Sequence, residues 1–197
     1  SMARAQGRAL AAGMRVGLLS DLAIGMNAGG SQAWSRPGDM LLGLSIGAPP
    51  DMLAPLGQNW GLTTFSPRTL RASGYAPFLA TLRAALRNAG GVRIDHVMGL
   101  VRLWLVPDGA RATEGVYLSY PTDELLALLC LESRRHEAVV IGEDLGTVPH
   151  GFRENLAEHG IAGLRVLQFE RNHEAFKPPH WYPAGAVAMT ATHDTAT

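Results

Sequence analysis

The sequence predicts an α/β fold built on a parallel sheet, and two observations lead to that prediction. Five short aliphatic runs are continuous rather than alternating, as expected of parallel strands that are covered on both faces. These runs span residues 14–19, 92–97, 138–142, 164–169 and 186–190. Helical patterns lie between them, and the alternation of strand and helix favours right-handed βαβ units.

Three helices are predicted in these connections. The first begins at Pro77, which suits a first helical turn, repeats apolar residues at intervals of three and four, and stops before Gly90. The second runs from about Thr122 to His136, with acidic residues in its first turn and basic residues in its last, where they complement the helix dipole. The third begins after Pro149.

The segment from residue 22 to residue 73 does not fit a plain crossover, because it is too long and is interrupted repeatedly by Gly and Pro. Trp34, Trp60 and Phe65 give it aromatic surface, which counts against a disordered insertion. Long irregular loops inside compact domains are commonly functional. We therefore expect residues 22–73 to form a long functional loop.

The composition points away from charged partners. Lys and Arg together number 17, as do Asp and Glu, so the formal net charge of zero predicts neither a nucleic acid nor an acidic membrane as partner. A neutral substrate fits better. The single cysteine, Cys130, lies in an apolar run and is expected to be a buried structural thiol. The lack of a disulfide framework, of a signal-peptide core and of any apolar stretch of about 18 residues predicts a cytoplasmic protein without a membrane span.

Carboxylates follow three of the five predicted strands. Asp95, Glu143 and Asp194 each come where an apolar run ends. In a parallel α/β barrel the carboxyl ends of the strands build one shared active site. Arg93 is two residues before Asp95, so both side chains point to the same face of an extended strand, and the arginine can keep the carboxylate ionised. Converging carboxylates beside a neutral polyol are what glycosidic chemistry requires.

Each of these residues also has a purely structural interpretation. Arg93 and Asp95 could form an ion pair at the end of the sheet, Glu143 could cap a helix, and His193 with Asp194 could open a loop. A metallohydrolase is a second alternative, with ligands drawn from the following acidic and histidine residues: Asp21, Asp95, His96, Glu143, His193 and Asp194. The absence of close His pairs and the positive charge of Arg93 argue against that alternative, so no metal and no cofactor are predicted.

Several strings resemble the signature regions of one known family, the amylomaltases or 4-α-glucanotransferases of glycoside hydrolase family 77. They are GVRIDHVMGL at 91–100, VIGEDLGTVP at 140–149 and THD at 192–194. GLLSDLA at 17–23 is similar to the family's third-strand motif, and GAPPD at 47–51 with GQNWG at 57–61 to its substrate-covering loop. Ala23 and Asn59 depart from residues common in the family, which leaves the details of the sugar subsites open.

The resemblance implies a role for each candidate residue. Asp95 would be the nucleophile, Glu143 the general acid and base, and Asp194 a carboxylate that grips sugar hydroxyls in the transition state. Arg93 would support Asp95, and Trp60 would stack on the acceptor sugar. The donor site would be lined by Asp21, His96 and His193. The implied substrates are malto-oligosaccharides, maltose and glucose, without a cofactor.

The resemblance also implies a (β/α)8 TIM barrel, of which residues 1–197 would be a partial catalytic domain. The chain would cover strands three to seven, with residues 22–73 as the covering loop after the third strand, and would lack strands one, two and eight. Two rival functions stay open. An α-glucan hydrolase of the α-amylase type shares the three carboxylates, although its third-strand motif usually ends in Asn-His, which is absent after Asp21. The other rival is a non-catalytic glucan-binding fragment.

Overall fold

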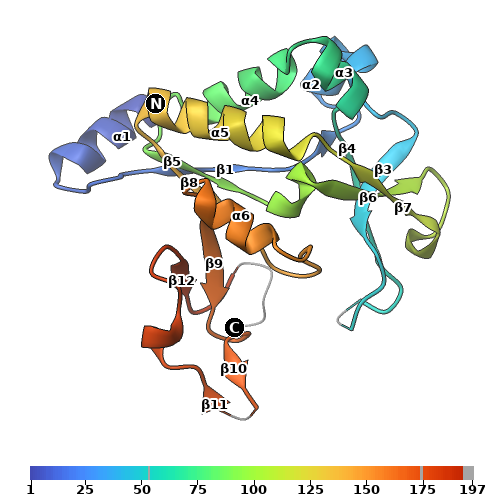
Figure 1. Cartoon of the computed structure of the whole chain (residues 1–197). Coiled ribbons are helices and arrows are strands. Elements are labelled where there is room, and N and C mark those ends of the chain that lie inside the picture. Colours follow the sequence, from blue (N-terminus) through green and yellow to red (C-terminus); the bar gives the residue numbers. More distant parts are fainter. Residues whose placement is uncertain (53, 174, 193–197) are drawn as a thin grey trace.

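A computed structural model describes residues 1–52, 54–173 and 175–192 (Figure 1). Its first sheet has five strands, all parallel, in the order β1-β5-β8-β9-β12. These strands are β1 (Leu19–Leu22), β5 (Gly91–Ile94), β8 (Val139–Gly142), β9 (Ala162–Val166) and β12 (Val187–Met189). The prediction of an α/β fold with five parallel strands is confirmed.

The start of the first strand was predicted wrongly. The aliphatic run at 14–19 suggested a strand from Met14, but β1 begins at Leu19. Helix α1 (Met2–Ala11), which was not predicted, lies beside this run. Its Gln6 side chain donates a hydrogen bond to the carbonyl of Val16 and accepts one from the amide of Leu18. The carbonyl of Val16 and the amide of Leu18 are thus hydrogen-bonded to a side chain instead of to a neighbouring strand.

The three predicted helices are confirmed and cover one side of the parallel sheet. They are α4 (Ala76–Leu86), α5 (Thr122–His136) and α6 (Phe152–Glu158). Figure 1 shows α4 and α5 side by side along β1, β5 and β8, with α6 next to β9. The core between helices and sheet is aliphatic; its fully buried members include Leu82, Leu86, Val92, Ile94, Leu126, Leu129 and Leu156. Cys130 on α5 is half-buried rather than buried, and its thiol donates to the carbonyl of His159.

A second sheet, antiparallel and also five-stranded, was missed by the sequence analysis. Its order is β2-β4-β3-β6-β7. The strands are β2 (Met26–Asn27), β3 (Leu44–Ala48), β4 (Gln58–Thr63), β6 (Arg102–Pro107) and β7 (Val116–Ser119). Three of the five lie within residues 22–73, so this segment is not the irregular loop that was expected.

Pairing between distant segments explains that error. β3 pairs with β4 on one side and, on the other, with β6, which belongs to a later connection of the chain. Backbone hydrogen bonds of this kind depend on the partner strand and leave little trace in the local sequence. The connection is completed by α2 (Ser31–Ser35), α3 (Pro67–Ala72) and the 3-10 helix η1 (Pro37–Asp39). Phe65 is buried, whereas Trp34 is 82% exposed.

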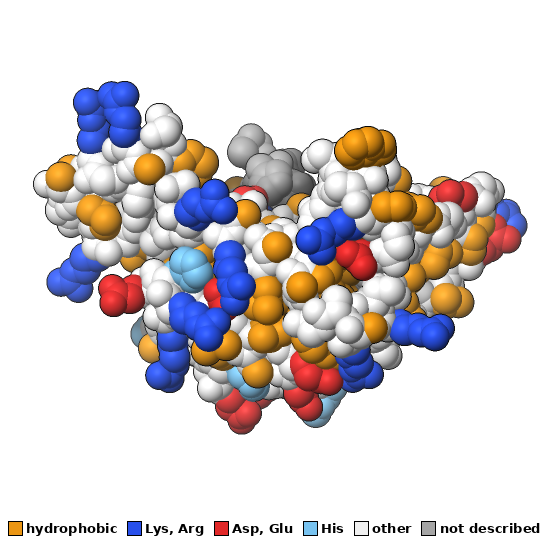
Figure 2. Space-filling view, turned by 90° about the horizontal axis from the view of Figure 1, so that it is seen from above, with side chains coloured by type: hydrophobic (Ala, Val, Ile, Leu, Met, Phe, Trp, Pro, Cys, Tyr) orange, Lys and Arg blue, Asp and Glu red, His pale blue; other side chains and the backbone are white. Residues whose placement is uncertain are grey.

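The remaining elements are short. They are the hairpin β10 (Arg171–Asn172) and β11 (Ala175–Phe176), and the 3-10 helices η2 (Val97–Leu100), η3 (Ala112–Glu114) and η4 (Pro179–Trp181). Of the helices in the described ranges, none is long and apolar enough to cross a membrane. Figure 2 shows one face of the molecule, on which acidic and basic side chains are interspersed, in keeping with the zero net charge.

Candidate active site

A cavity of about 940 Å³ lies where the carboxyl ends of the parallel strands meet the second sheet. Its floor is formed by residues at the ends of β5 and β8, namely Arg93, Asp95, His96 and Glu143. The second sheet supplies one wall, with Gln58, Trp60, Arg102, Trp104 and Tyr117. Another part of the lining comes from Arg153, Phe169, Glu170, Lys177 and Thr192.

Backbone hydrogen bonds fix the two carboxylates that follow adjacent strands. The amide of Asp95 donates to the carbonyl of Leu22 on β1, and the amide of Glu143 donates to the carbonyl of Ile94 on β5. Gly142, just before Glu143, has no room for a side chain, since an added Cβ would lie 2.9 Å from a methyl group of Val97. Each carboxylate therefore sits on a backbone whose position is set by the neighbouring strand.

Arg93 joins two carboxylates. Its guanidinium donates to Asp95 and to Asp21, with both N–O distances 2.7 Å. The predicted contact between Arg93 and Asp95 is thus present. Burial lowers the pKa of Arg93, but hydrogen bonds and the charges of Asp21 and Asp95 outweigh it, so this pKa lies above its ordinary value. Asp21 is exposed at the end of β1 and reaches the site through Arg93.

Glu143 is held by two backbone amides. The N–H of His96 donates to one carboxylate oxygen at 2.8 Å, and the N–H of Leu145 donates to the other at 2.7 Å. Burial is the largest influence on the pKa of Glu143 and raises it. The two N–H groups and the charge of Arg93 lower this pKa, while the charge of Asp95 raises it further. The net pKa lies above the ordinary value, which suits a group that must donate a proton.

His96 and Trp60 form an aromatic corner of the cavity. His96 adopts a left-handed backbone conformation with φ of 48°, which turns the chain directly after Asp95. Its ring meets the Trp60 ring edge to face, with the centroids 5.1 Å apart. Burial lowers the pKa of His96, although the charge of Asp95 opposes this effect. The imidazole is therefore neutral at pH 7, and the corner presents polar edges and an aromatic surface without a full charge.

The sequence analysis missed an aromatic group on the second sheet. Trp104 and Tyr117 are directly opposite each other on β6 and β7, and their rings meet edge to face at 5.1 Å. The guanidinium carbon of Arg102 lies 4.1 Å from the centroid of the Tyr117 ring. Alternation along 102–105 could have revealed this group, because Leu103 and Leu105 are buried in the core between residues that line the cavity.

Two of the predicted site residues, His193 and Asp194, lie outside the described residues. Thr192, the last described residue, lines the cavity. The remaining candidates are Asp21, Trp60, Arg93, Asp95, His96 and Glu143; all but Asp21 line the same cavity, and Asp21 joins them through Arg93. Within the described ranges, no group of three or more His, Cys, Asp or Glu side chains is arranged to hold a metal ion.

Comparison with known proteins places the whole chain in one sequence family. A family model described as 4-alpha-glucanotransferase matches residues 1–197. The 4-alpha-glucanotransferase of Haemophilus influenzae is 47% identical over 92% of this chain, and that of Mycobacterium tuberculosis is 44% identical over 98%. The matched regions make up 26% and 27% of those proteins, so the chain spans about a quarter of the length of these curated relatives.

Solved structures have the same fold. The crystal structure of amylomaltase from Corynebacterium glutamicum superposes with a TM-score of 0.93 at 38% identity, covering 98% of this chain and 28% of that one. Amylomaltase from Streptococcus agalactiae in complex with acarbose gives a TM-score of 0.79 at 23% identity, covering 89% of this chain and 37% of that one. At this lower identity the second comparison supports the fold alone.

Proposed function

Because the chain belongs to the 4-alpha-glucanotransferase family, glycoside hydrolase family 77, we propose that it carries the catalytic centre of such an enzyme. The reaction would move α-1,4-glucan segments from a donor malto-oligosaccharide to an acceptor sugar with retention of configuration. One observation carries the proposal: Asp95 and Glu143 line the same cavity, one paired with Arg93 and the other held by two backbone amides with a raised pKa. These are the two environments that a nucleophile and a general acid need.

The first step of the proposed mechanism forms a covalent intermediate. An oxygen of the Asp95 carboxylate attacks the anomeric carbon of the donor while the glycosidic C–O bond breaks. Glu143 gives its proton to the departing oxygen, which leaves as the 4-hydroxyl of the released glucan. Arg93 holds Asp95 at 2.7 Å and restricts the orientation of its carboxylate.

The second step returns the enzyme to its starting state. Glu143, now ionised, takes the proton from the 4-hydroxyl of an acceptor sugar, and the acceptor oxygen attacks the anomeric carbon and releases Asp95. Asp194 is proposed to bind sugar hydroxyls in the transition state, and His193 and His96 to line the donor site with Asp21. The sequence resemblance supports these roles, and the position of Thr192 on the cavity is compatible with them.

The second sheet is proposed to bind the glucan chain. Trp60 would stack on the acceptor sugar and help exclude water from the intermediate. Trp104 and Tyr117 extend the aromatic surface of this wall, and the neighbouring Arg102 can donate hydrogen bonds to hydroxyl groups. In this proposal residues 22–73 cover the substrate as part of a folded sheet.

The same proposal includes the architecture and location of the complete protein. The five parallel strands would correspond to strands three to seven of a (β/α)8 barrel, so that strands one, two and eight would come from other parts of the protein. The substrates would be malto-oligosaccharides, maltose and glucose, with neither nucleic acid nor membrane as partner. A cytoplasmic location is proposed because a lone cysteine suits a reducing compartment.

Maltotriose distinguishes the three candidate functions. The complete protein is incubated with maltotriose, and the products are separated by length. We expect glucose together with a ladder of longer and shorter chains, because an acceptor sugar replaces water in the second step. Shorter chains alone would indicate an α-amylase-type hydrolase, and unchanged maltotriose would indicate a non-catalytic glucan-binding protein.

A further inference from the structure

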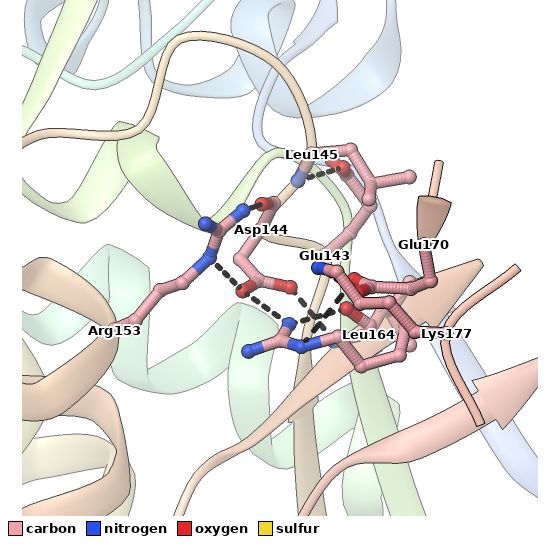
Figure 3. A network of polar contacts seen from close by, with 8 residues as sticks. Glu143, Asp144, Leu145, Arg153, Leu164, Glu170 and Lys177 are labelled. Atoms are coloured by element: carbon pink, nitrogen blue, oxygen red, sulfur yellow. Dashed lines mark hydrogen bonds and ion pairs between the residues drawn. The ribbon is translucent and has the colours of Figure 1, made fainter. Parts of the chain in front are cut away.

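Asp144, the residue after Glu143, is a buried carboxylate that the mechanism above does not use. Its side chain is 1% exposed and is surrounded by donors (Figure 3). One oxygen accepts a hydrogen bond from the backbone amide of Leu164 at 2.7 Å. The other accepts from Arg153 at 2.7 Å and from Arg165 at 3.1 Å. Arg153 also donates to the backbone carbonyl of Asp144, so both the side chain and the backbone of this residue are held.

The contacts of Asp144 extend along the edge of the cavity. Arg165 Nε lies 3.8 Å from Glu170, and Glu170 accepts a hydrogen bond from Lys177 at 2.8 Å. Figure 3 shows this chain of alternating charges beside Glu143. It links the end of β8 to β9 and to the segment of the β10–β11 hairpin.

Asp144 also sits inside the turn that holds Glu143. The amide of Leu145, one residue after Asp144, donates to the Glu143 carboxylate at 2.7 Å. The backbone of Asp144 therefore links the proposed acid and base to one of its two hydrogen-bond donors. The Asp144 side chain is packed closely on β9, because an added Cβ on Gly163 would lie 3.0 Å from its carboxylate.

We propose that Asp144 is a positioning residue that holds the Glu143 carboxyl in line with the glycosidic oxygen. This inference depends on the proposed transferase function, in which Glu143 is the general acid and base. It assigns no contact between Asp144 and the sugar. The ion pairs with Arg153 and Arg165 fix the backbone of the turn at 143–145, and this backbone sets the orientation of the Glu143 carboxyl.

If Asp144 positions Glu143, its loss affects only the reaction steps that use Glu143; if it only stabilises the fold, its loss affects every step. Misplacing Glu143 slows proton donation but leaves the Asp95 nucleophile intact. A donor such as α-maltotriosyl fluoride releases fluoride, which does not need protonation by an acid, so its first step is insensitive to the position of Glu143. General damage to the site would slow both donors.

The test uses Asp144→Asn in the complete protein. Asparagine has nearly the same shape and can still accept from Leu164, but it lacks the charge that pairs with the two arginines. We expect kcat with maltotriose to fall about 10- to 100-fold with KM nearly unchanged. The initial rate of fluoride release from α-maltotriosyl fluoride is expected to stay within about 3-fold of the rate for the unsubstituted protein, because this first step needs no proton from Glu143.

A second variant keeps the test decisive if Asp144→Asn does not fold. Arg153→Gln removes two hydrogen bonds to Asp144 from a side chain that is 46% exposed. Its kcat with maltotriose should fall by about 3- to 10-fold, a smaller loss than for Asp144→Asn, while fluoride release from α-maltotriosyl fluoride should again change little. Arg71→Gln, which removes an exposed ion pair with Glu124 on α5, is the matched control and should leave the rates with both donors unchanged.

Each outcome decides the proposal. Equal losses with both donors would make Asp144 a structural residue only, and unchanged turnover of maltotriose would remove any positioning role. Failure of the proposed function is recognised separately: the unsubstituted protein would then leave maltotriose unchanged or only hydrolyse it.

Discussion

The carboxylate of Glu143 and the backbone amide of His96 are joined by a hydrogen bond of 2.8 Å. Glu143 follows β8, and His96 comes directly after Asp95 at the end of β5. The bond therefore fastens one proposed catalytic carboxyl to the backbone next to the other. The end of β5 therefore helps to set the position of the Glu143 carboxylate.

Replacing Asp95 by Asn is expected to abolish transfer and leave oligosaccharide binding largely intact. Asparagine preserves the shape of the side chain but is a poor nucleophile, so the loss should exceed about 1,000-fold in kcat. Transfer is measured with maltotriose and binding by calorimetry. A fully active Asp95→Asn variant would contradict the whole mechanism.

Replacing Glu143 by Gln should trap the covalent intermediate when α-maltotriosyl fluoride is the donor. The first step needs no proton from residue 143, whereas the second step lacks the base that activates the acceptor. Intact mass and peptide mapping should therefore locate a glycosyl adduct on Asp95. An adduct on Glu170 or Asp21 would reassign the nucleophile.

The charge of Asp95 is expected to add to the effect of burial on the ionisation of Glu143. Because this charge raises the pKa of Glu143, Asp95→Asn should lower that pKa and shift its titration to lower pH. The midpoint is measured from the carboxyl carbon signal of Glu143 in the NMR spectrum of each variant. An unchanged midpoint would show that the two groups are too far apart to interact.

In the proposed mechanism the same coupling would help Glu143 to serve as acid and then as base. Formation of a glycosyl ester on Asp95 would remove its negative charge, so the pKa of Glu143 would fall in the intermediate. The carboxyl would then be protonated more readily before the first step and ionised more readily before the second.

Glu132 is expected to contribute to stability in a pH-dependent way. It is fully buried on α5 and accepts hydrogen bonds from Arg83 on α4 and from Arg135, and the bonds from Arg83 are the main reason that its pKa falls to about 2. A lowered pKa stabilises the fold above the ordinary Glu pKa, and this stabilisation is lost as the pH falls through the folded-state value.

Glu132→Gln should therefore lower the free energy of unfolding at pH 7 by about 1–3 kcal/mol. The difference from the unsubstituted protein, measured by urea denaturation, should shrink as the pH is lowered from 5 towards 2. Glu124→Gln, which breaks an exposed ion pair on the same helix, is the control and should change stability much less than Glu132→Gln. A loss for Glu132→Gln that does not vary with pH would show that its charge is not the cause.

Tyr117 is expected to distinguish long from short glucans. Tyr117→Ala removes aromatic surface from the wall formed by β6 and β7, so we expect a loss of about 5- to 20-fold in affinity for maltoheptaose and a smaller loss for maltotriose. Affinities are measured by calorimetry. Trp34→Ala, which removes an exposed aromatic ring on α2, should change neither value. The expectation assumes that Tyr117 contacts sugar units that maltotriose is too short to reach. Equal losses for both sugars after Tyr117→Ala would contradict it.

The parallel sheet could be predicted from the sequence because its signals are local. Pro77, Thr122 and Pro149 mark the helix starts, and apolar runs mark the strands between them. Asp95 and Glu143 could be identified for the same reason, since each directly follows such a run. The contact of Arg93 with Asp95 follows from a spacing of two residues on an extended strand.

The rest depends on contacts between distant segments. The pairing of β3 with β6 brings Gly47 opposite Trp104, residues from different connections, so neither segment alone indicates the wall that they build. The late start of β1 depends on Gln6, which satisfies backbone groups ten and twelve residues further along the chain. Such effects arise only once the elements have packed.

The shared second sheet also limits how this protein can be engineered. β2, β3 and β4 come from one connection and the hairpin β6–β7 from the next, and β3 is the strand at which the two contributions join. Exchanging only one connection with that of a relative would leave β3 beside a foreign partner or with an uncovered edge, which favours aggregation. The two connections are therefore a single exchangeable unit, and loop grafting aimed at new glucan specificity should transfer residues 22–73 and 101–120 together.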